Sequence, residues 1–238
     1  MSTVAAVIIG DELLAGRFAD ENGPWLVQRL RALGARLVRM TTVGDDPAAI
    51  EDAVSRSLAV ADAVITSGGI GPTHDDNTLA AVAAALARPL VIHEGLLERL
   101  ATWGAGDDAA NRRMASLPFG TEIVTTPRGF PVFVADRVVV LPGVPRLFRT
   151  GFDAVASRFA GPPAAEVWVV TSRSEGAFAT ALAEWVLVHP EIDVGSYPRL
   201  DEVPAVVRLS VTGKDAARVA CLAFALATLV GGAVEPKA

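Results

Sequence analysis

The amino-acid sequence predicts an α/β protein in which a mainly parallel sheet carries helices on both faces, with a smaller α+β domain after it. Segments typical of strands alternate with segments typical of helices across residues 4–159, as in doubly covered parallel sheets. The first apolar run, residues 4–9, has no polar side chain, as expected of a strand buried on both faces. A Gly-Pro-Pro linker at 161–163 ends this pattern. We therefore expect one domain at residues 1–161 and a second at 165–238.

The first half of the large domain contains clear helix signals between its strands. Pro24 suits the first turn of a helix, and Gly34 is a typical stop. Asp75 or Asp76 is the expected cap of an alanine-rich helix. The expected elements, in order, are a strand at 4–9, a helix from about 24 to 34, a strand at 35–42, a helix at 47–60, a strand at 63–66 and a helix that ends near residue 87.

The second half of the large domain is expected to begin with a helical stretch over residues 94–116, broken at Gly104-Ala105-Gly106. Two strands follow, at 131–134 and 137–141, and then a helix that ends near residue 159. In the small domain, the elements expected after the linker are a strand at 166–171, a helix at 175–187, strands at 193–197 and 205–212, and a helix at 215–230. This order is βαββα.

The composition narrows the class of protein. Hydrophobic residues make up 51% of the 238 residues, enough for a sizeable core. The net charge of -6 argues against a nucleic-acid-binding surface. The single cysteine, Cys221, allows no intrachain disulfide, and we expect its thiol to be buried. The longest uncharged run, residues 219–234, is shorter than the roughly 20 residues of a membrane-spanning helix. We expect a cytoplasmic protein without a signal peptide and without membrane or nucleic-acid partners.

Loops rich in glycine or acidic residues follow the expected strands. The carboxyl ends of parallel strands share one edge of a sheet, and ligands bind at that edge. The four loops are Gly10-Asp11-Glu12, Gly44-Asp45-Asp46, residues 67–78, and Pro142-Gly143-Val144-Pro145. We expect the functional site where these loops meet.

The loop Ser67-Gly68-Gly69-Ile70-Gly71-Pro72-Thr73 carries the strongest signal. Its glycines permit a sharp turn and let backbone N–H groups come close to a ligand, and the helix that follows favours an anion at its N-terminus. Ser67 and Thr73 offer hydroxyl groups to a phosphate. A tight turn between a strand and a helix would explain the glycines equally well if they were considered alone.

Six carboxylates share the same predicted edge, and they point to a cation. Carboxylates beside a phosphate-binding loop repel the ligand unless a cation lies between them, and Mg²⁺ prefers a few carboxylates together with substrate phosphates. Some of the six are natural helix caps, Asp46 before Pro47 among them. We expect two or three to be functional. The six are Asp11, Glu12, Asp45, Asp46, Asp75 and Asp76.

Three separate motifs resemble one known family. The run Gly69-Ile70-Gly71-Pro72-Thr73-His74-Asp75-Asp76-Asn77-Thr78 resembles the GGxGPTxDDxT signature of the molybdopterin-binding MoaB/Mog superfamily. The start, Ile9-Gly10-Asp11-Glu12-Leu13-Leu14 with Gly16 and Asn22, and the later Leu141-Pro142-Gly143-Val144-Pro145 fit the same family. The resemblance covers about residues 3–160 and is closest to the amino-terminal part of the competence/damage-inducible CinA-type proteins.

The last third of the chain is also similar to parts of this family. Asp193-Val194-Gly195-Ser196-Tyr197-Pro198 resembles the small KH-like domain of CinA-type proteins and the molybdopterin-binding-like region of FAD synthases. One segment departs from the CinA-type pattern: Thr126-Pro127-Arg128-Gly129-Phe130-Pro131-Val132 stands where those proteins usually have Asn-x-x-Gly-x-Ala-Pro-Gly. It is closer to the FAD-synthase branch.

The resemblance implies roles for individual residues. It implies Asp45 and Asp76 as catalytic residues and, with Asp75, as ligands of a divalent metal such as Mg²⁺, Mn²⁺ or Co²⁺. The implied ligand-binding and phosphate-binding residues are Ser67, Gly68, Gly69, Gly71, Thr73, Gly10, Glu12, Asn22, Pro142 and Gly143.

Two functional classes follow from this resemblance. The first is a metal-dependent enzyme that hydrolyses the pyrophosphate bond of a dinucleotide such as ADP-ribose or FAD. The second is a non-catalytic protein that binds a nucleotide or a pterin such as molybdopterin, or an adenylyl-transfer step in molybdenum-cofactor synthesis. The acidic edge favours the enzyme, whereas the lack of an evident general base keeps the second class open.

We expect a homodimer, because the resembled family is usually oligomeric and the chain is rich in apolar residues for its size. Light scattering at micromolar protein concentration tests this expectation. A monomer mass would contradict it.

Overall fold

The computed structural model describes residues 2–103, 108–127 and 130–235. The chain divides into two units, Met1–Gly161 and Pro162–Ala238, which are described one at a time. Of the segments discussed above, the predicted helix break at 104–106 and the pair Arg128-Gly129 lie outside the described residues.

The first unit is built on a six-stranded sheet in which the first four strands are parallel. The last two strands run antiparallel to their neighbours, because β7 and β8 form a hairpin and β6 pairs with β7. In spatial order the strands are β2 (Arg36–Val43), β1 (Thr3–Ile9), β3 (Ala63–Ser67), β8 (Val138–Leu141), β7 (Val132–Ala135) and β6 (Glu122–Val124).

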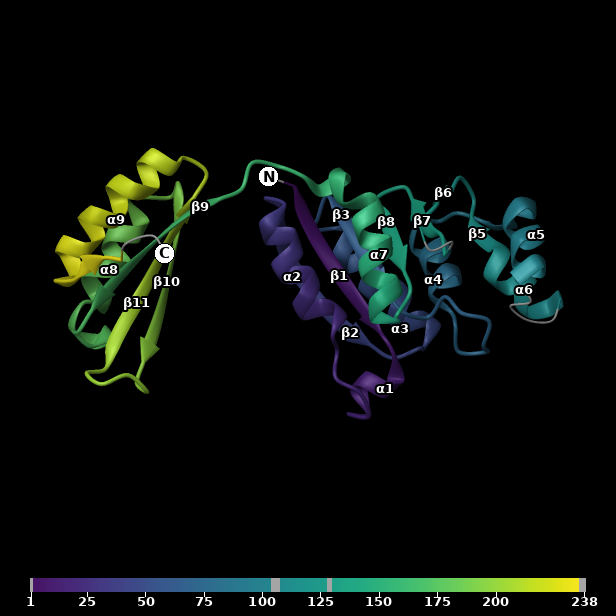
Figure 1. Ribbon diagram of the computed structural model, residues 1–238, viewed down its shortest axis with the longest axis horizontal. Coiled ribbons are helices and arrows are strands. Elements are labelled where there is room, and N and C mark those ends of the chain that lie inside the picture. Colours follow the sequence, from purple (N-terminus) through teal and green to yellow (C-terminus); the bar gives the residue numbers. More distant parts are fainter. Residues whose placement is uncertain (1, 104–107, 128–129, 236–238) are drawn as a thin grey trace. The chain divides into compact units, whose positions relative to one another are not determined.

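Helices cover both faces of this sheet (Figure 1). Side chains alternate between the two faces along β1. Val4 and Ala6 pack in one core with residues of α2 (Asn22–Ala32) and α7 (Pro145–Val155). Ala5 and Val7 pack in the other core with residues of α3 (Pro47–Leu58) and α4 (Thr78–Ala85). Both faces of β1 are therefore buried, which explains its uninterrupted apolar sequence.

Shorter elements complete the first unit. A single helical turn, α1 (Asp11–Leu14), follows β1 directly. A two-stranded antiparallel ribbon lies apart from the main sheet and is formed by strands on either side of two helices. In chain order these elements are β4 (Leu90–Ile92), α5 (Glu94–Trp103), α6 (Asp108–Ala115) and β5 (Ser116–Pro118), and the unit ends with the 3-10 helix η1 (Ala156–Phe159).

The second unit is a four-stranded antiparallel sheet with helices packed against it. Its main helix, α9, is capped by the Asp215 carboxylate, which accepts hydrogen bonds from the Ala217 and Arg218 N–H groups, and ends at Gly231 with φ 63°. In chain order the elements are β9 (Ala165–Thr171), the 3-10 helix η2 (Glu175–Ala177), α8 (Ala179–Leu187), β10 (Ile192–Arg199), β11 (Val206–Gly213), α9 (Ala216–Val230) and β12 (Ala233–Val234).

The predicted fold class is confirmed at the level of a mainly parallel α/β sheet followed by a small antiparallel unit. The order of the small unit is βαββαβ, because the short β12 was not predicted, and its KH-like character stays a prediction. The predicted cap of α4 is wrong: the helix begins at Thr78 and Asn77 precedes it, so neither Asp75 nor Asp76 is in capping position. The Cys221 thiol is exposed, not buried. None of the helices in the described ranges has the length and apolar character needed to cross a membrane.

A core substitution tests the layer formed by α2 and α7. Phe152 is fully buried and packs edge-on to Trp25 and parallel to Phe159, with ring centroids 5.5 and 5.6 Å away. Phe152→Ala should lower the free energy of unfolding by about 3–5 kcal/mol, because it leaves a cavity in a packed core. Chemical denaturation measures this. Phe119→Ala, at a side chain that is 62% exposed, is the control and should change stability little.

Candidate functional site

A cavity of about 570 Å³ opens at the carboxyl ends of the parallel strands, a size typical of small-molecule sites. The loops after β1, β2, β3 and β8 all contribute to its lining, as the sequence predicted. Thr73 alone among the expected site residues is not part of the lining. The expected site residues that do line it are Gly10, Glu12, Asn22, Asp45, Ser67, Gly68, Gly69, Gly71, Asp75, Asp76, Pro142 and Gly143.

Asn22 joins two of these loops from the start of α2. Its side-chain N–H₂ group donates to the Ser67 Oγ at 2.9 Å and to the Gly143 carbonyl at 2.7 Å. Asn22 is only 5% exposed, and its Oδ1 has no hydrogen-bond partner in the described part of the chain. Asp20 holds this helix end in place by accepting from the backbone N–H groups of Asn22 and Gly23. Asn22 thus lines the cavity and keeps a buried acceptor without a partner among the described residues.

Two glycines after β3 are required by close packing. Gly68 has φ 105° and Gly69 has φ 65°, both in the region that favours glycine. A Cβ on Gly68 would collide with the Ile9 carbonyl, and one on Gly69 would collide with the Thr78 hydroxyl. Thr78 in turn donates its hydroxyl to the Gly68 carbonyl at 2.8 Å. The main chain of this loop is therefore packed closely against β1 and hydrogen-bonded to Thr78 of α4.

The backbone amides of this loop divide into used and free groups. The Gly68 N–H donates to the Leu141 carbonyl at 3.1 Å, next to the β3–β8 ladder, so this amide is already engaged within the chain. The amides of Gly69, Ile70 and Gly71 donate to no group within the described ranges. These three residues also line the cavity. Backbone donors for an anion are thus available at Gly69 and Gly71, two of the expected glycines, and at Ile70 between them.

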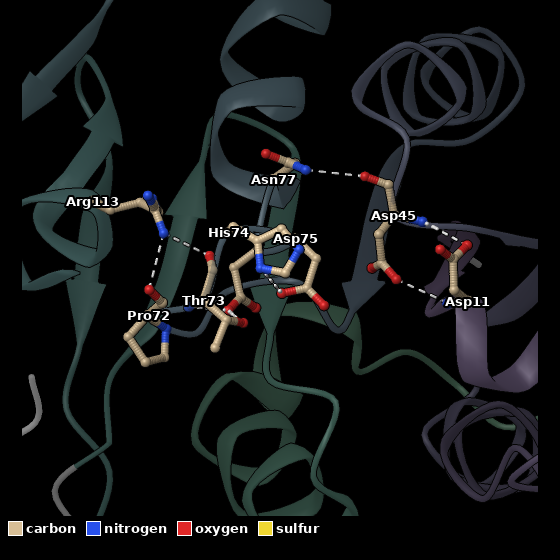
Figure 2. A network of polar contacts seen from close by, with 9 residues as sticks. Asp11, Asp45, Pro72, Thr73, His74, Asp75, Asn77 and Arg113 are labelled. Carbon is tan, nitrogen blue, oxygen red and sulfur yellow. Dashed lines mark hydrogen bonds and ion pairs between the residues drawn. The ribbon is translucent and has the colours of Figure 1, made fainter.

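Asp45 and Asp11 hold each other across the ends of β1 and β2 (Figure 2). The Asp11 N–H donates to the Asp45 carboxylate at 2.9 Å, and the Asp45 N–H donates to the Asp11 carboxylate at 3.3 Å. Asn77 adds a hydrogen bond to the Asp45 carbonyl at 3.1 Å. Burial raises the pKa of Asp45 above its ordinary value of 3.8, and the nearby charges of Asp11 and Glu12 act in the same direction. Hydrogen bonds therefore hold the Asp45 carboxylate close to other negatively charged side chains.

Asp76 closes the turn that follows the glycine loop. Its Oδ2 accepts from the Thr73 N–H at 2.8 Å and from the Thr73 hydroxyl at 2.6 Å. The Thr73 hydroxyl is therefore engaged with Asp76, which agrees with its absence from the cavity lining. The neighbouring Asp75 also lines the cavity and adds a charge that raises the pKa of Asp45. Asp46 is the cap of α3, since its carboxylate accepts from the Ala49 N–H.

Arg113 is a residue of this region that the sequence did not reveal. From α6, its guanidinium donates to the carbonyls of Pro72 and Thr73 at 3.0 and 2.8 Å (Figure 2). It lies 40 positions away from Thr73 in the sequence and has no motif around it. Because Arg113 is one of nineteen arginines in the chain, its residue type alone carries no sequence signal. Arg113 therefore holds the second half of the loop through the carbonyls of Pro72 and Thr73.

Three large apolar side chains from separate segments line the cavity. Phe18 comes from the segment between α1 and α2, Met114 from α6, and Phe130 from the residues before β7. Phe18 is 69% exposed although it is aromatic. An exposed aromatic side chain beside a polar loop suits the face of a planar ring. Phe18 has no sequence signal of its own, since aromatic residues in loops are common.

The carboxylates do not form a ready-made metal cage. Among the described residues, no group of three or more His, Cys, Asp or Glu side chains is placed to hold a metal ion together. Asp45, Asp75 and Asp76 nevertheless line one cavity with oxygen donors. This donor set fits a hard cation that takes one or two carboxylates and completes its coordination with ligand phosphates and water.

The chain matches two protein families, one for each unit. Residues 5–161 match the family described as "Probable molybdopterin binding domain". Residues 166–237 match the family described as "FAD synthase, middle domain".

Individual relatives agree with these matches. The chain is 31% identical over 214 residues to a protein of Archaeoglobus fulgidus, covering 90% of this chain and 91% of the relative. It is 38% identical over 223 residues to a CinA-like protein of Mycobacterium sp. (strain JLS), covering 84% of this chain and 52% of that protein. The chain thus spans about half the length of this CinA-like relative. The crystal structure of a CinA protein with unknown function from Thermoplasma acidophilum is similar, with a TM-score of 0.61 and 29% identity, covering 66% of this chain and 98% of that one.

The raised pKa of Asp45 predicts a pH dependence of stability. Folding raises this pKa above 3.8, so the native state binds the proton more readily than the unfolded chain does. The contribution of Asp45 to the free energy of unfolding is therefore most favourable at low pH and declines as the pH rises from 3.8 through the folded-state pKa. Asp45→Asn removes the titration, so the wild type should lose stability relative to this variant over that range. Urea denaturation at a series of pH values measures the difference. Parallel pH profiles for the two proteins would contradict the prediction.

Proposed function

The chain belongs to the molybdopterin-binding-domain family, and on that premise we propose that it is an enzyme that hydrolyses the pyrophosphate bond of a dinucleotide such as ADP-ribose or FAD with a divalent metal. One observation carries the proposal. Free backbone amides at 69–71 share a cavity with carboxylates from two separate loops, those of Asp45 and of Asp75 and Asp76. Amides that attract an anion and carboxylates that repel it are compatible when a cation accompanies the anion.

The amides of Gly69, Ile70 and Gly71 are proposed to hold the pyrophosphate. Consecutive backbone N–H groups form a concave donor surface for phosphate oxygens, and the main chain here is fixed on both sides by Thr78 and Arg113. Such fixed donors stabilise charge that develops on the phosphate oxygens in the transition state. They need no rearrangement during the reaction.

Asp45, Asp75 and Asp76 are proposed to hold Mg²⁺, Mn²⁺ or Co²⁺ together with the phosphates. A bound divalent ion would neutralise phosphate charge and activate water. The carboxylates are oriented by backbone donors: the Asp11 N–H for Asp45 and the Thr73 N–H for Asp76. Asp45 and Asp76 therefore each use one carboxylate oxygen for these hydrogen bonds.

The apolar side chains that line the cavity support the proposal of a ligand with a planar ring. A dinucleotide places a flat base or flavin next to its phosphates, and Phe18, Met114 and Phe130 line the same cavity as the glycine loop. The match of the second unit to the FAD synthase middle domain adds support for a flavin dinucleotide among the substrates.

A second candidate is a protein that binds a pterin or nucleotide without hydrolysing it, or that takes part in adenylyl transfer to molybdopterin. The lack of a group of three or more metal-holding side chains among the described residues favours this candidate. The two candidates differ in turnover, not in where the ligand sits.

A substrate screen separates the two candidates. Purified protein should release product from ADP-ribose or FAD in the presence of Mg²⁺, Mn²⁺ or Co²⁺ and should lose this activity when the metal is chelated. Chromatography of the nucleotide products measures the reaction. Binding of these compounds or of a pterin with no product formed under any metal would leave the binding protein as the function.

Single carboxylate-to-amide substitutions test the assigned residues. Asp76→Asn keeps an oxygen that can accept both hydrogen bonds from Thr73 but removes the charge. Turnover should fall at least about tenfold, roughly 1.4 kcal/mol of transition-state stabilisation, while the melting temperature changes little. Asp45→Asn should behave in the same way, because Asn can still accept from the Asp11 N–H.

Asp46→Asn is the matched control for these variants. Asp46 neighbours Asp45 but caps α3 and is not part of the cavity lining, and Asn caps a helix as well as Asp does. This variant should keep full activity. Full activity in Asp45→Asn and Asp76→Asn as well would remove the catalytic assignment.

A further inference from the structure

The outer strand of the small ribbon, β4, is short and apolar and has an open edge. Its residues Leu90, Val91 and Ile92 are 42%, 39% and 39% exposed. Within the described ranges β4 pairs with β5 alone. A two-stranded ribbon is only marginally stable by itself, and an exposed apolar edge strand is a template for pairing with another strand.

The backbone groups at this edge are oriented for such a pairing. The His93 N–H donates to the Ala115 carbonyl, and the Pro89 carbonyl accepts from the Phe119 N–H, both at 2.8 Å. Residues 89, 91 and 93 therefore direct their backbone groups toward β5. Because these groups alternate along an antiparallel strand, Leu90 and Ile92 direct their N–H and C=O groups to the open side.

We propose that β4 pairs with β4 of a second copy of this chain, so that the two ribbons form one four-stranded antiparallel sheet. A two-fold axis at Val91 places Leu90 opposite the second copy's Ile92, and both residues have outward backbone groups. This register makes four hydrogen bonds between the copies. It brings the two Val91 side chains together at a close, non-hydrogen-bonded position, where β-branched pairs pack well.

Charge complementarity favours a second copy over an unrelated strand. Arg88 lies two residues before β4, and Glu94, the first residue of α5, lies two residues after it. The two-fold axis therefore brings Arg88 of each copy to the end of the interface where Glu94 of the other copy lies. Glu94 is exposed and has no ion-pair partner among the described residues. Within the described ranges, the Arg88 guanidinium donates to the Phe119 carbonyl at 3.2 Å and has no carboxylate partner. The sequence Arg-Pro-Leu-Val-Ile-His-Glu of residues 88–94 is thus complementary to itself when read antiparallel.

Charge exchange tests this pairing in solution. Arg88→Glu puts two carboxylates opposite each other at both ends of the interface, and Glu94→Arg does the same with two guanidinium groups. Each variant should raise the dimer dissociation constant about tenfold or more relative to the wild type, since two attractive pairs become repulsive. A 1:1 mixture of the two variants restores both attractive pairs and should dimerise as tightly as the wild type. Sedimentation velocity over a concentration series measures all four samples.

Ile92→Pro provides an independent test at the centre of the edge. Its N–H faces the open side, so proline removes donors between the copies without removing a β4–β5 hydrogen bond. The variant should be monomeric and keep the circular dichroism spectrum of the wild type. If Ile92→Pro does not fold, the two exposed charge variants decide the question. The pairing is wrong if the wild type is monomeric throughout the series. It is also wrong if the charge variants dimerise as tightly as the wild type, or if their mixture dimerises no better than either alone.

Discussion

The shape of the cavity depends on two hydrogen bonds that the buried Asn22 side chain donates. Its two hydrogen bonds join Ser67, at the end of β3, to the Gly143 carbonyl, in the loop after β8. These three residues are far apart in the sequence: Asn22 begins α2, whereas Ser67 and Gly143 lie at the ends of two neighbouring strands of the sheet. Without the Asn22 amide, the buried Ser67 hydroxyl and the partly buried Gly143 carbonyl lose a donor. An unsatisfied buried group costs about 1–3 kcal/mol. The Asn22 side chain therefore holds α2 against the sheet and also joins two residues that line the cavity, Ser67 and Gly143.

This constraint explains why the loop next to it is made of glycine. A Cβ on Gly143 would lie 3.3 Å from the Gly68 Cα, so the two loops pack main chain against main chain. Such packing leaves room for a ligand above the loop and keeps the amides of 69–71 in place. Carboxylates held nearby by backbone N–H groups then give the cavity both an anion-attracting and an anion-repelling side. Ligands that carry their own cation suit this surface better than a bare phosphate does.

The sequence predicted most of the fold and the loops that line the cavity. It missed features that depend on long-range contacts. The apolar run of β1 is a local signal that predicted a buried strand, and the glycines after β3 form the sharp turn that they permit. Asp76 was expected as a helix cap because it precedes an alanine-rich helix. It accepts from Thr73 instead, since the turn before α4 is longer than propensity indicates. The three-residue strands β4, β5 and β6 are too short to show a period, and Arg113 is positioned only by the tertiary fold.

The ribbon and the site are connected through α6. Strand β5 begins at Ser116, directly after α6 ends at Ala115, and Arg113 of that helix holds the carbonyls of Pro72 and Thr73. A second copy paired at β4 would order the ribbon and, with it, the end of α6 that carries Arg113. Dissociation would remove no residue from the cavity, because Arg113 makes both hydrogen bonds within a single copy. Within one chain, the ribbon and the glycine loop are therefore joined by α6 and by the two hydrogen bonds of the Arg113 guanidinium.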